Sequence, residues 1–510
     1  MRKIIGKETD NNISSKSNNI SDSVEDVNKN VIYNCHSHIF IIDHVPNKFG
    51  KRILPFPLHL ILTIKVVKWF YNNLTERGNQ KYRSFKHKLR NLKFSIYELL
   101  KSTWILWILY SIIKYLFKLI FNIISNFLKI DVLFSKESIE LYYRYLTLAR
   151  YSTRYKSQKQ IYNFLKKNYP PKTKHIILSM DMDKSSMDAG SPKVSYMEQI
   201  EELRQLGRNN KDLLPFVFAH PKRIKDTKEL TQNSNYFNYM KYYLSKKHFS
   251  GIKLYPALGY YPFDKELIKL YEFAQEMEIP IMSHCIKGTV FFRGKKDQKW
   301  NEHEILKYPA KGKKRKVIPL PQKKNYEFTS NFTHPLNYEC LLNPEILSEY
   351  IGRDIDLSKL KICLAHFGGT EEWEKYRKDA FNNYNNRISP VSRDEYLESK
   401  YKNTLTFGNA RTIWWNASWL CIIYDLIVKY ENVYSDVSFI LYNEELFPLL
   451  KYLLNDQKVK HRILFGTDYY VVSQKGLDKD LYQTLRSYLG EGLFKLIAVD
   501  NPKTYLETKL

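Results

Sequence analysis

Two histidines separated by one residue follow an apolar run near the amino-terminal end of the chain. The segment reads Val31-Ile32-Tyr33 and continues as Asn34-Cys35-His36-Ser37-His38. If this run is a strand, the alternation of side chains turns His36 and His38 to the same side. Two neutral imidazoles on one side of a strand end can bind one metal ion. A His-X-His triplet is a weak signal by itself, so other parts of the chain must supply further ligands.

Three later apolar runs are followed by residues that could complete such a site. These residues are His284, His366 and Asp468, after the runs at 279–283, 361–365 and 462–465. If the runs are parallel strands that end at one edge, their terminal side chains meet there. Three histidines and one carboxylate suit Zn²⁺ or another divalent ion, and a fourth imidazole is then left for proton transfer. The predicted metal ligands are His36, His38, His284 and Asp468, and the predicted proton-transfer group is His366.

The runs that must position these residues recur through the chain. They lie at 31–34, 176–182, 216–219, 251–254, 279–283, 361–365, 432–437 and 462–465. Stretches with helical spacing, such as 197–206, 264–277 and 417–429, separate them. Apolar runs that alternate with helices are typical of parallel strands buried on both faces, and eight such strands close a βα barrel. The sequence therefore predicts an α/β fold, a distorted (β/α)8 TIM barrel with a large helical insertion after strand 1.

The long interval between the first two runs divides the chain into four parts. Residues 1–30 are polar and predict a disordered tail. Residues 31–49 hold the first barrel strand with its metal ligands, 50–165 form a basic, aromatic-rich helical insertion, and 166–510 complete the barrel. From Lys48 to Lys129 there are 16 Lys or Arg and two acidic residues, which is half of the net charge of +28. This basic excess suggests an anionic partner, and a solvated face in a Lys-rich composition is the alternative.

The segment 94–130 of the insertion mixes Leu, Ile, Trp, Tyr and Phe with scattered lysines. Its longest uncharged stretch, 102–113, has 12 residues and is followed by Lys114 and Lys118, which disfavours a membrane-spanning helix. We expect 94–130 to make either a peripheral contact with an anionic membrane or a packing contact with the barrel or a second subunit. No specific nucleic-acid partner is expected, because the aromatic residues are mixed with aliphatic ones.

Cysteine usage and the amino-terminal residues bear on the compartment. Five Cys without a C-x-x-C pair indicate neither a disulfide framework nor a thiolate zinc cluster. Polar residues follow Arg2, Lys3 and Lys7, so no secretory signal is expected. The expected location is cytoplasmic, with membrane association through 94–130 as the alternative.

Taken together, the strand-end motifs resemble the amidohydrolase superfamily. The similarity is to the amidohydrolase-related branch that includes relatives of aminocarboxymuconate-semialdehyde decarboxylase. The matching stretches are CHSH at 35–38, GIKLYP at 251–256, SH at 283–284, THP at 333–335, AHFGG at 365–369 and FGTDY at 465–469. The resemblance covers about 31–46 and 176–510, and it does not cover the insertion.

This resemblance implies a metal-dependent hydrolase that cleaves a C–N or C–O bond of a small substrate. Asp468 would both bind the metal and accept a proton from water, with His366 as the acid/base or substrate-orienting group. Lys253 and Tyr255 would contact the substrate, which Lys253 suggests is anionic. One Zn²⁺ is the expected cofactor, and a second ion would require carbamylated Lys253. A non-oxidative decarboxylase that uses the same site is the alternative. A membrane-associated or binding protein with an inactive barrel is the third hypothesis.

Other residues at the strand ends are candidates for supporting roles. Asp181, Asp183, His220 and Asp436 could hold ligand imidazoles through their second ring nitrogen. Cys35 and Cys285 adjoin predicted ligands, and we expect them to be small core residues that face away from the barrel mouth.

Overall fold

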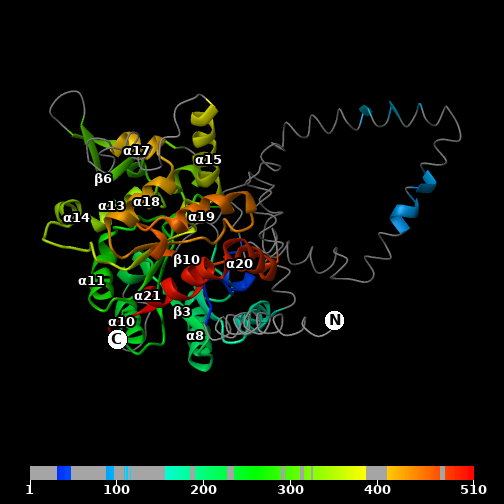
Figure 1. Ribbon diagram of the computed structural model, residues 1–510, viewed down its shortest axis with the longest axis horizontal. Coiled ribbons are helices and arrows are strands. Elements are labelled where there is room, and N and C mark those ends of the chain that lie inside the picture. The colour runs from blue at the N-terminus through cyan, green and yellow to red at the C-terminus, as the bar shows by residue number, and fades with distance from the viewer. Residues whose placement is uncertain are drawn as a thin grey trace, which may run out of the picture.

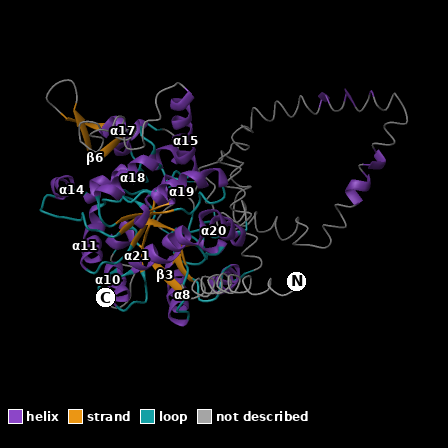
Figure 2. Ribbon diagram, viewed as in Figure 1, coloured by secondary structure: helices purple, strands orange, loops and turns teal. Residues whose placement is uncertain are grey.

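Eight parallel strands form a barrel at the centre of the computed structural model, and helices surround it (Figures 1 and 2). The strands are β1 (Tyr33–Ser37), β2 (Lys174–Leu178), β3 (Leu213–Phe218), β4 (Gly251–Leu254), β5 (Ile281–His284), β8 (Ile362–Ala365), β9 (Val433–Asp436) and β10 (Ile463–Leu464). Their order in the sheet is their order in the chain. A parallel bridge between Ser37 and Tyr469 joins β1 to the segment after β10 and closes the ring. The predicted (β/α)8 fold is therefore confirmed.

The structure describes most of the barrel-forming chain and little of the region between β1 and β2. The described residues are 31–47, 88–92, 94–96, 108, 111–112, 115–116, 155–183, 190–226, 235–288, 292, 294–309, 315–322, 325–385, 410–470 and 477–510. The predicted tail at 1–30 lies outside these ranges, as does most of the predicted insertion. The predicted roles of both parts stay predictions.

Each apolar run identified in the sequence contains or overlaps one strand of the barrel. The largest shift is at the second run, where β2 begins at Lys174 and ends at Leu178. β1 extends to Ser37, so that His36 lies within the strand and His38 just beyond it. A register shift against β2 between Asn34 and Ser37 bends this end of the strand. The strand end that carries the two histidines is thus irregular where it approaches the barrel mouth.

The helices follow the strands in the alternation expected of this fold. They are α7 (Gln158–Leu165), α8 (Tyr196–Asn209), α9 (Pro221–Lys225), α10 (Tyr236–Ser245), α11 (Ile268–Glu276), α12 (Asn325–Thr329), α13 (Leu336–Leu342), α14 (Pro344–Ile351), α15 (Thr370–Asn385), α17 (Ala410–Asn416), α18 (Trp419–Lys429), α19 (Phe447–Asn455), α20 (Asp478–Lys495) and α21 (Asn501–Leu506). The predicted helices at 197–206, 264–277 and 417–429 correspond to α8, α11 and α18. The first of these begins with a capping box in which Ser195 and Glu198 satisfy each other's backbone N–H groups.

An antiparallel hairpin interrupts the connection between β5 and β8. It consists of β6 (Glu302–Pro309) and β7 (Arg315–Pro319). The runs and helices predicted from the sequence do not include this hairpin, whose second strand begins with Arg315 and Lys316. The hairpin escaped the sequence pattern because its turn lacks the Asn-Gly or Asp-Gly signal and its strands are rich in charged residues.

Two apolar layers fill the barrel and separate it from the helices. The interior layer consists of Tyr33, Cys35, Ile176, Leu178, Phe216, Met282, Cys363, Ala365, Tyr434, Leu464 and Tyr505. Tyr505 of α21 plugs the amino-terminal end of the barrel, where its hydroxyl donates a 2.8 Å hydrogen bond to the carbonyl of Ile281. Because apolar side chains fill that end, the polar groups of the interior are concentrated toward the carboxyl-terminal mouth.

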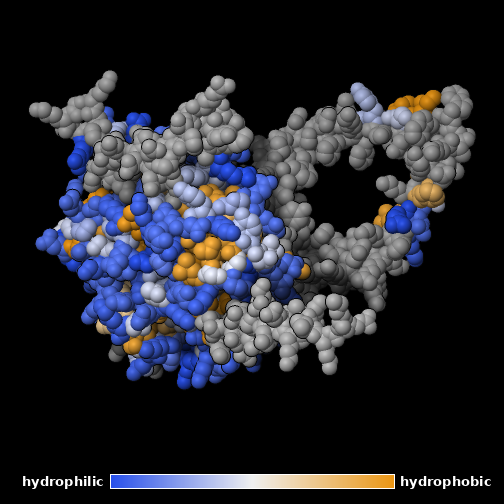
Figure 3. All heavy atoms as spheres, in the orientation of Figure 1, coloured by the Kyte–Doolittle hydropathy of each residue, from blue (hydrophilic) through white to orange (hydrophobic). Residues whose placement is uncertain are grey.

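The face seen in Figure 3 is mostly hydrophilic, with apolar residues in separate patches. In the described part of the chain, no helix combines the length and the apolar character needed to cross a membrane. Helix α7 lies at the end of the predicted insertion and contacts helix α8 of the barrel. The side-chain amide of Gln158 donates a 2.9 Å hydrogen bond to the carbonyl of Gln199 on α8.

Candidate metal centre

The two histidines of the first strand present their Nε2 atoms to the same point at the barrel mouth. Each ring is held by its other nitrogen. His36 Nδ1 lies 2.9 Å from Asp436 Oδ2, and His38 Nδ1 lies 3.0 Å from the carbonyl oxygen of Leu178. Both acceptors make Nδ1 the protonated nitrogen, so the lone pair is on Nε2. This is the tautomer that a metal ligand requires when it binds through Nε2.

Asp468 reaches this point from the opposite end of the chain. The segment after β10 lies against β1, and the backbone N–H of Asp468 donates a 2.9 Å hydrogen bond to the carbonyl of His36. Gly466 permits this approach, because a Cβ atom there would lie 2.7 Å from the Cβ of His36. The backbone of Asp468 is left-handed, with φ of 56°. This rare conformation for a residue other than Gly turns the carboxylate toward the two histidines.

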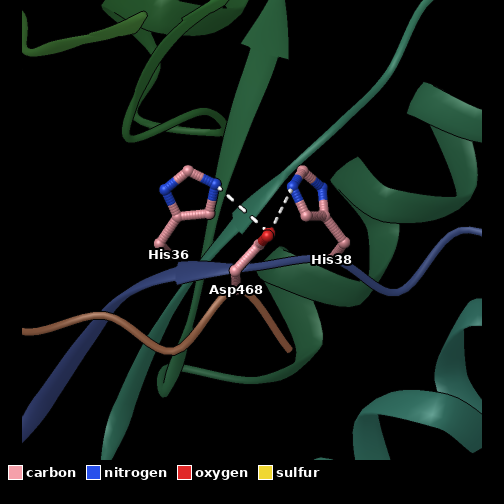
Figure 4. A group of neighbouring side chains, drawn as sticks. All are labelled: His36, His38 and Asp468. Atoms are coloured by element: carbon pink, nitrogen blue, oxygen red, sulfur yellow. Dashed lines mark ion pairs between the residues drawn. The ribbon is translucent and has the colours of Figure 1, made fainter. Parts of the chain in front are cut away.

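The three side chains form a compact buried group (Figure 4). Asp468 Oδ1 lies 3.6 Å from His36 Nε2 and 3.4 Å from His38 Nε2. All three residues are at most 5% exposed, and all their ligand atoms lie within 4.8 Å of one another. Two ligands of a tetrahedral ion at about 2.1 Å are about 3.4 Å apart. The observed separations therefore fit a shared divalent ion.

A buried nitrogen supports the same interpretation. His36 Nε2 has no hydrogen-bond partner among the residues that the structure describes. A buried polar atom without a partner costs on the order of 1–3 kcal/mol, so a native site normally supplies one. A cation between His36 and Asp468 would supply it.

His366 lies beside this group and has a different set of contacts. It follows β8, and its ring is 4.6 Å from that of His36, centroid to centroid. One ligand atom each of His36, His366 and Asp436 also lie within 4.8 Å of one another, close enough to share an ion. In that second group, however, His36 and Asp436 already hydrogen-bond each other at 2.9 Å. Their facing atoms are used, so the group with His38 and Asp468 is the better candidate for an ion.

His284 was predicted to be the third imidazole ligand. In the structure, the side chain of His366 lies between His284 and the group of His36, His38 and Asp468. The Nδ1 atom of His284 lies 3.1 Å from His366 Nε2. The His284 ring stacks on Tyr255 with centroids 4.0 Å apart. The structure thus brings together His36, His38 and Asp468, whereas His284 adjoins them through His366. Its role as a ligand stays a prediction.

Lys253 and Tyr255, the predicted substrate contacts, lie at the end of β4. Lys253 is fully buried, and its amine has no hydrogen-bond partner among the described residues. Its Nζ lies 5.8 Å from the centre of the Tyr255 ring. Burial lowers the pKa of Lys253 to about 8, against the opposing effect of Asp436 and Asp468. The arrangement could serve an anionic substrate group, and it is equally compatible with carbamylation, because a neutral amine is the reactive form.

The charges of the site are separated by their surroundings. Burial opposes the ionisation of Asp468, but the proximity of His38, His366 and His36 holds its pKa at about 2. Burial also opposes the ionisation of Asp436, but the proximity of His36 outweighs it, so the pKa of Asp436 is below its usual range. Burial and the proximity of His36 lower the pKa of His366 to about 3, and burial lowers the pKa of His38. The site therefore combines two carboxylates with the neutral imidazoles of His38 and His366, and divalent metals bind ionised carboxylates and neutral imidazoles.

The remaining strand-end candidates have structural contacts. Asp181 and Asp183 both pair with Arg223, at 2.6 and 3.1 Å. His220 caps α9, where its Nδ1 accepts the N–H of Lys222. Asp436 is the one of the four that holds a predicted ligand imidazole among the described contacts.

Three other motif residues are accounted for by packing. His334, in the THP stretch, stacks on Trp414 with centroids 3.8 Å apart and lies outside the site. Cys35 and Cys285 are fully buried. Cys35 belongs to the barrel interior, and the Cys285 thiol donates to the carbonyl of Thr333 at 3.3 Å.

One residue of the site was not identified from the sequence. Ser438, two residues after the end of β9, lies 2.8 Å from His366 Nδ1 through its hydroxyl oxygen and also contacts Asp436 Oδ1. The available signal was its position two residues after Asp436, which places both at one strand end. A serine at a strand end is too common for that signal to have been decisive.

Comparisons with known proteins assign this chain to no family. No protein-family model matches this chain, and no curated protein matches it either. Among solved structures, an uncharacterised TIM-barrel protein of Bordetella bronchiseptica is similar over 70% of this chain and 84% of its own, with 13% sequence identity and a TM-score of 0.35. Similarity at this level assigns no reaction to this chain.

Proposed function

We propose that this chain is a metal-dependent hydrolase that resembles the amidohydrolase-related enzymes. One divalent ion, with Zn²⁺ as the first choice, is held by His36, His38 and Asp468, and His284 is the proposed fourth ligand. The observation that carries the proposal is the buried group of two Nε2 atoms facing one carboxylate oxygen at 3.4 and 3.6 Å. It lies at the carboxyl-terminal end of the strands, where barrel enzymes have their active sites.

The chemistry divides between the ion and the side chains. A divalent ion bound there supplies Lewis acidity, which lowers the pKa of water to about 7 and polarises a substrate carbonyl. Asp468 is ionised at neutral pH and can accept a proton at its second carboxylate oxygen. His366 is neutral before reaction, and its Nε2 faces His284 Nδ1 at 3.1 Å, so it can take a proton there once the substrate displaces that contact, and it can return the proton to the leaving group. Lys253 is placed to attract an anionic group of the substrate.

The alternatives use the same residues and differ in what they release or bind. A decarboxylase would liberate CO₂ from a carboxylated substrate, whereas a hydrolase would release an amine or an alcohol together with an acid. A site with two ions would require carbamylated Lys253. We favour one ion, because substrate binding explains the buried amine without a modification.

Metal analysis of the full-length protein tests the proposal. We expect about one divalent ion per chain, with loss of the ion in His36→Ala and in Asp468→Ala. His334→Ala is a matched control, because it also removes a buried imidazole but lies outside the site. Full metal content in both site variants would refute the metal centre.

A second measurement separates chemistry from binding. His366→Asn should retain the ion and lower turnover by about 10²-fold or more, the usual effect of removing a positioned acid or base. Substrate panels of amides, esters, lactones and carboxylated aromatic acids provide the assay. Release of CO₂ without hydrolysis would replace the proposed hydrolase by the decarboxylase, and loss of metal in His366→Asn would make His366 a ligand.

A further inference from the structure

Asp436 accepts hydrogen bonds on both carboxylate oxygens and so links two parts of the site. On one side, Oδ2 faces His36 Nδ1 at 2.9 Å. On the other side, Oδ1 accepts the backbone N–H of Ser438 at 3.0 Å, the backbone N–H of His366 at 3.1 Å and the hydroxyl of Ser438. An ionised carboxylate has no hydrogen to donate, so each of these neighbours must be the donor.

The direction of the Ser438 bond determines which nitrogen of His366 carries hydrogen. A hydroxyl has one hydrogen, and Ser438 directs it to Asp436. Toward His366 Nδ1, which is 2.8 Å away, the Ser438 oxygen can then only accept. His366 is therefore protonated at Nδ1.

The same reasoning extends to the next histidine. A fully buried imidazole is disfavoured as a cation, so His366 has a lone pair on Nε2. That atom lies 3.1 Å from His284 Nδ1, which must be the donor. In its neutral form, His284 then has its own lone pair on Nε2. The hydrogen bonds from Ser438 to Asp436, from His366 to Ser438 and from His284 to His366 therefore place the proton on Nδ1 in both histidines.

We propose that Asp436 and Ser438 are positioning residues that fix the tautomers of the site histidines. Asp436 makes His36 a ligand through Nε2, and Ser438 places the lone pair of His366 on Nε2, where it accepts from His284 Nδ1. His284 follows His366 and presents Nε2 in the same way. The proposed function is needed only to say what these lone pairs do in the site. The tautomers themselves follow from the hydrogen bonds and can be measured without substrate.

Nuclear magnetic resonance of full-length protein labelled with ¹⁵N-histidine tests this inference. The ¹⁵N shifts of the ring nitrogens distinguish Nδ1–H from Nε2–H, and single substitutions assign the signals. In the wild-type protein after chelation, His36, His366 and His284 should all be protonated at Nδ1. A wild-type His366 protonated at Nε2 would overturn the proposal, whether or not any variant folds.

Two substitutions should change different histidines. In Asp436→Asn, the two backbone N–H groups favour the amide oxygen at the Oδ1 position, so the amide NH₂ faces His36 and switches it to Nε2–H. We expect metal affinity to fall by about 10- to 100-fold, the usual effect of losing the group that orients a ligand. In Ser438→Ala, His366 loses its acceptor and should become a mixture of tautomers, while His36 and the metal content stay as in the wild type.

A conservative variant provides the control for structure. Ser438→Thr retains the hydroxyl and should restore the wild-type tautomer of His366. An unchanged His36 in Asp436→Asn, or an unchanged His366 in Ser438→Ala, would refute the assignment to these two residues. If the tautomers are as expected but no metal binds, the proposed function fails and the positioning network stands.

Discussion

The contact between Gly466 and His36 provides a sharp test of how the barrel closes around its site. The segment after β10 approaches β1 so closely that a Cβ at position 466 would lie 2.7 Å from His36 Cβ and 3.1 Å from His36 N. Gly466→Ala adds only this one atom. Because the nearest neighbours belong to or directly adjoin the backbone, no flexible side chain can move aside to relieve the contact.

The size of the effect follows from these distances. To reach an ordinary contact of 3.4 Å, the two segments must separate by about 0.7 Å. Overpacking of this kind costs about 1–3 kcal/mol of folding free energy. The displacement also exceeds the tolerance of a metal site, about 0.2 Å in each ligand distance. Since His36 and Asp468 lie on the two segments, Gly466→Ala should both destabilise the barrel and weaken metal binding.

Urea unfolding and metal content measure the two effects, with Gly492→Ala as the matched control. Gly492 lies in α20, and nothing is within 4 Å of the position that its Cβ would occupy. Replacing a helical Gly by Ala at an open position stabilises by about 0.5–1 kcal/mol. We therefore expect opposite signs for the same chemical change at two sites. Wild-type stability and full metal content in Gly466→Ala would refute the described approach of β10 to β1.

Two further predictions concern the buried amine and the insertion. Burial lowers the pKa of Lys253 from 10.5 to about 8. Between these pH values the unfolded chain binds more protons than the folded one, so the free energy of unfolding rises with pH. Below pH 8 the folded protein bears the whole cost of burying the charged amine, on the order of 3 kcal/mol. Lys253→Met should remove this rise in urea unfolding and be the more stable protein at pH 7, and an unchanged pH dependence would indicate a modified or paired amine. The protein should sediment with anionic vesicles at low salt and not with neutral ones, because Phe94 and Tyr115 are each 67% exposed amid many lysines; equal failure with both vesicles would favour a packing contact for 94–130.

The sequence allowed the barrel to be predicted because its signal is repeated and local. Parallel strands covered by helices are buried on both faces, so each becomes a continuous apolar run such as Ile362–Ala365. Eight runs in the right alternation leave few other folds. The hairpin β6–β7 was missed because it stands outside this pattern, as its strands carry charged residues and pair with each other only.

The candidate site was predictable in composition and not in its contacts. Histidines and carboxylates at strand ends were identified because the fold brings every such end to one mouth. Which nitrogen faces which neighbour depends on bonds between residues as far apart as His36 and Asp436, 400 positions away in the sequence. Nothing local specifies that His284 turns Nδ1 to His366, or that Ser438 lies between His366 and Asp436.

Three residues at the barrel mouth have a costly backbone conformation. His366, Phe367 and Asp468 have φ values of 71°, 47° and 56°, in the left-handed region that Gly normally occupies. Each such residue costs on the order of 1–2 kcal/mol, and a Gly at the same position would avoid it. The fold compensates with bonds from the backbone N–H of His366 to Asp436 and of Asp468 to His36. These bonds come from the groups that also set the tautomers and the ligand positions. The same conformation occurs at Lys172, Lys247 and Glu278 outside the site, so it is the direction of the side chains that matters here. At Asp468 it turns the carboxylate toward His36 and His38, as the proposed metal centre requires.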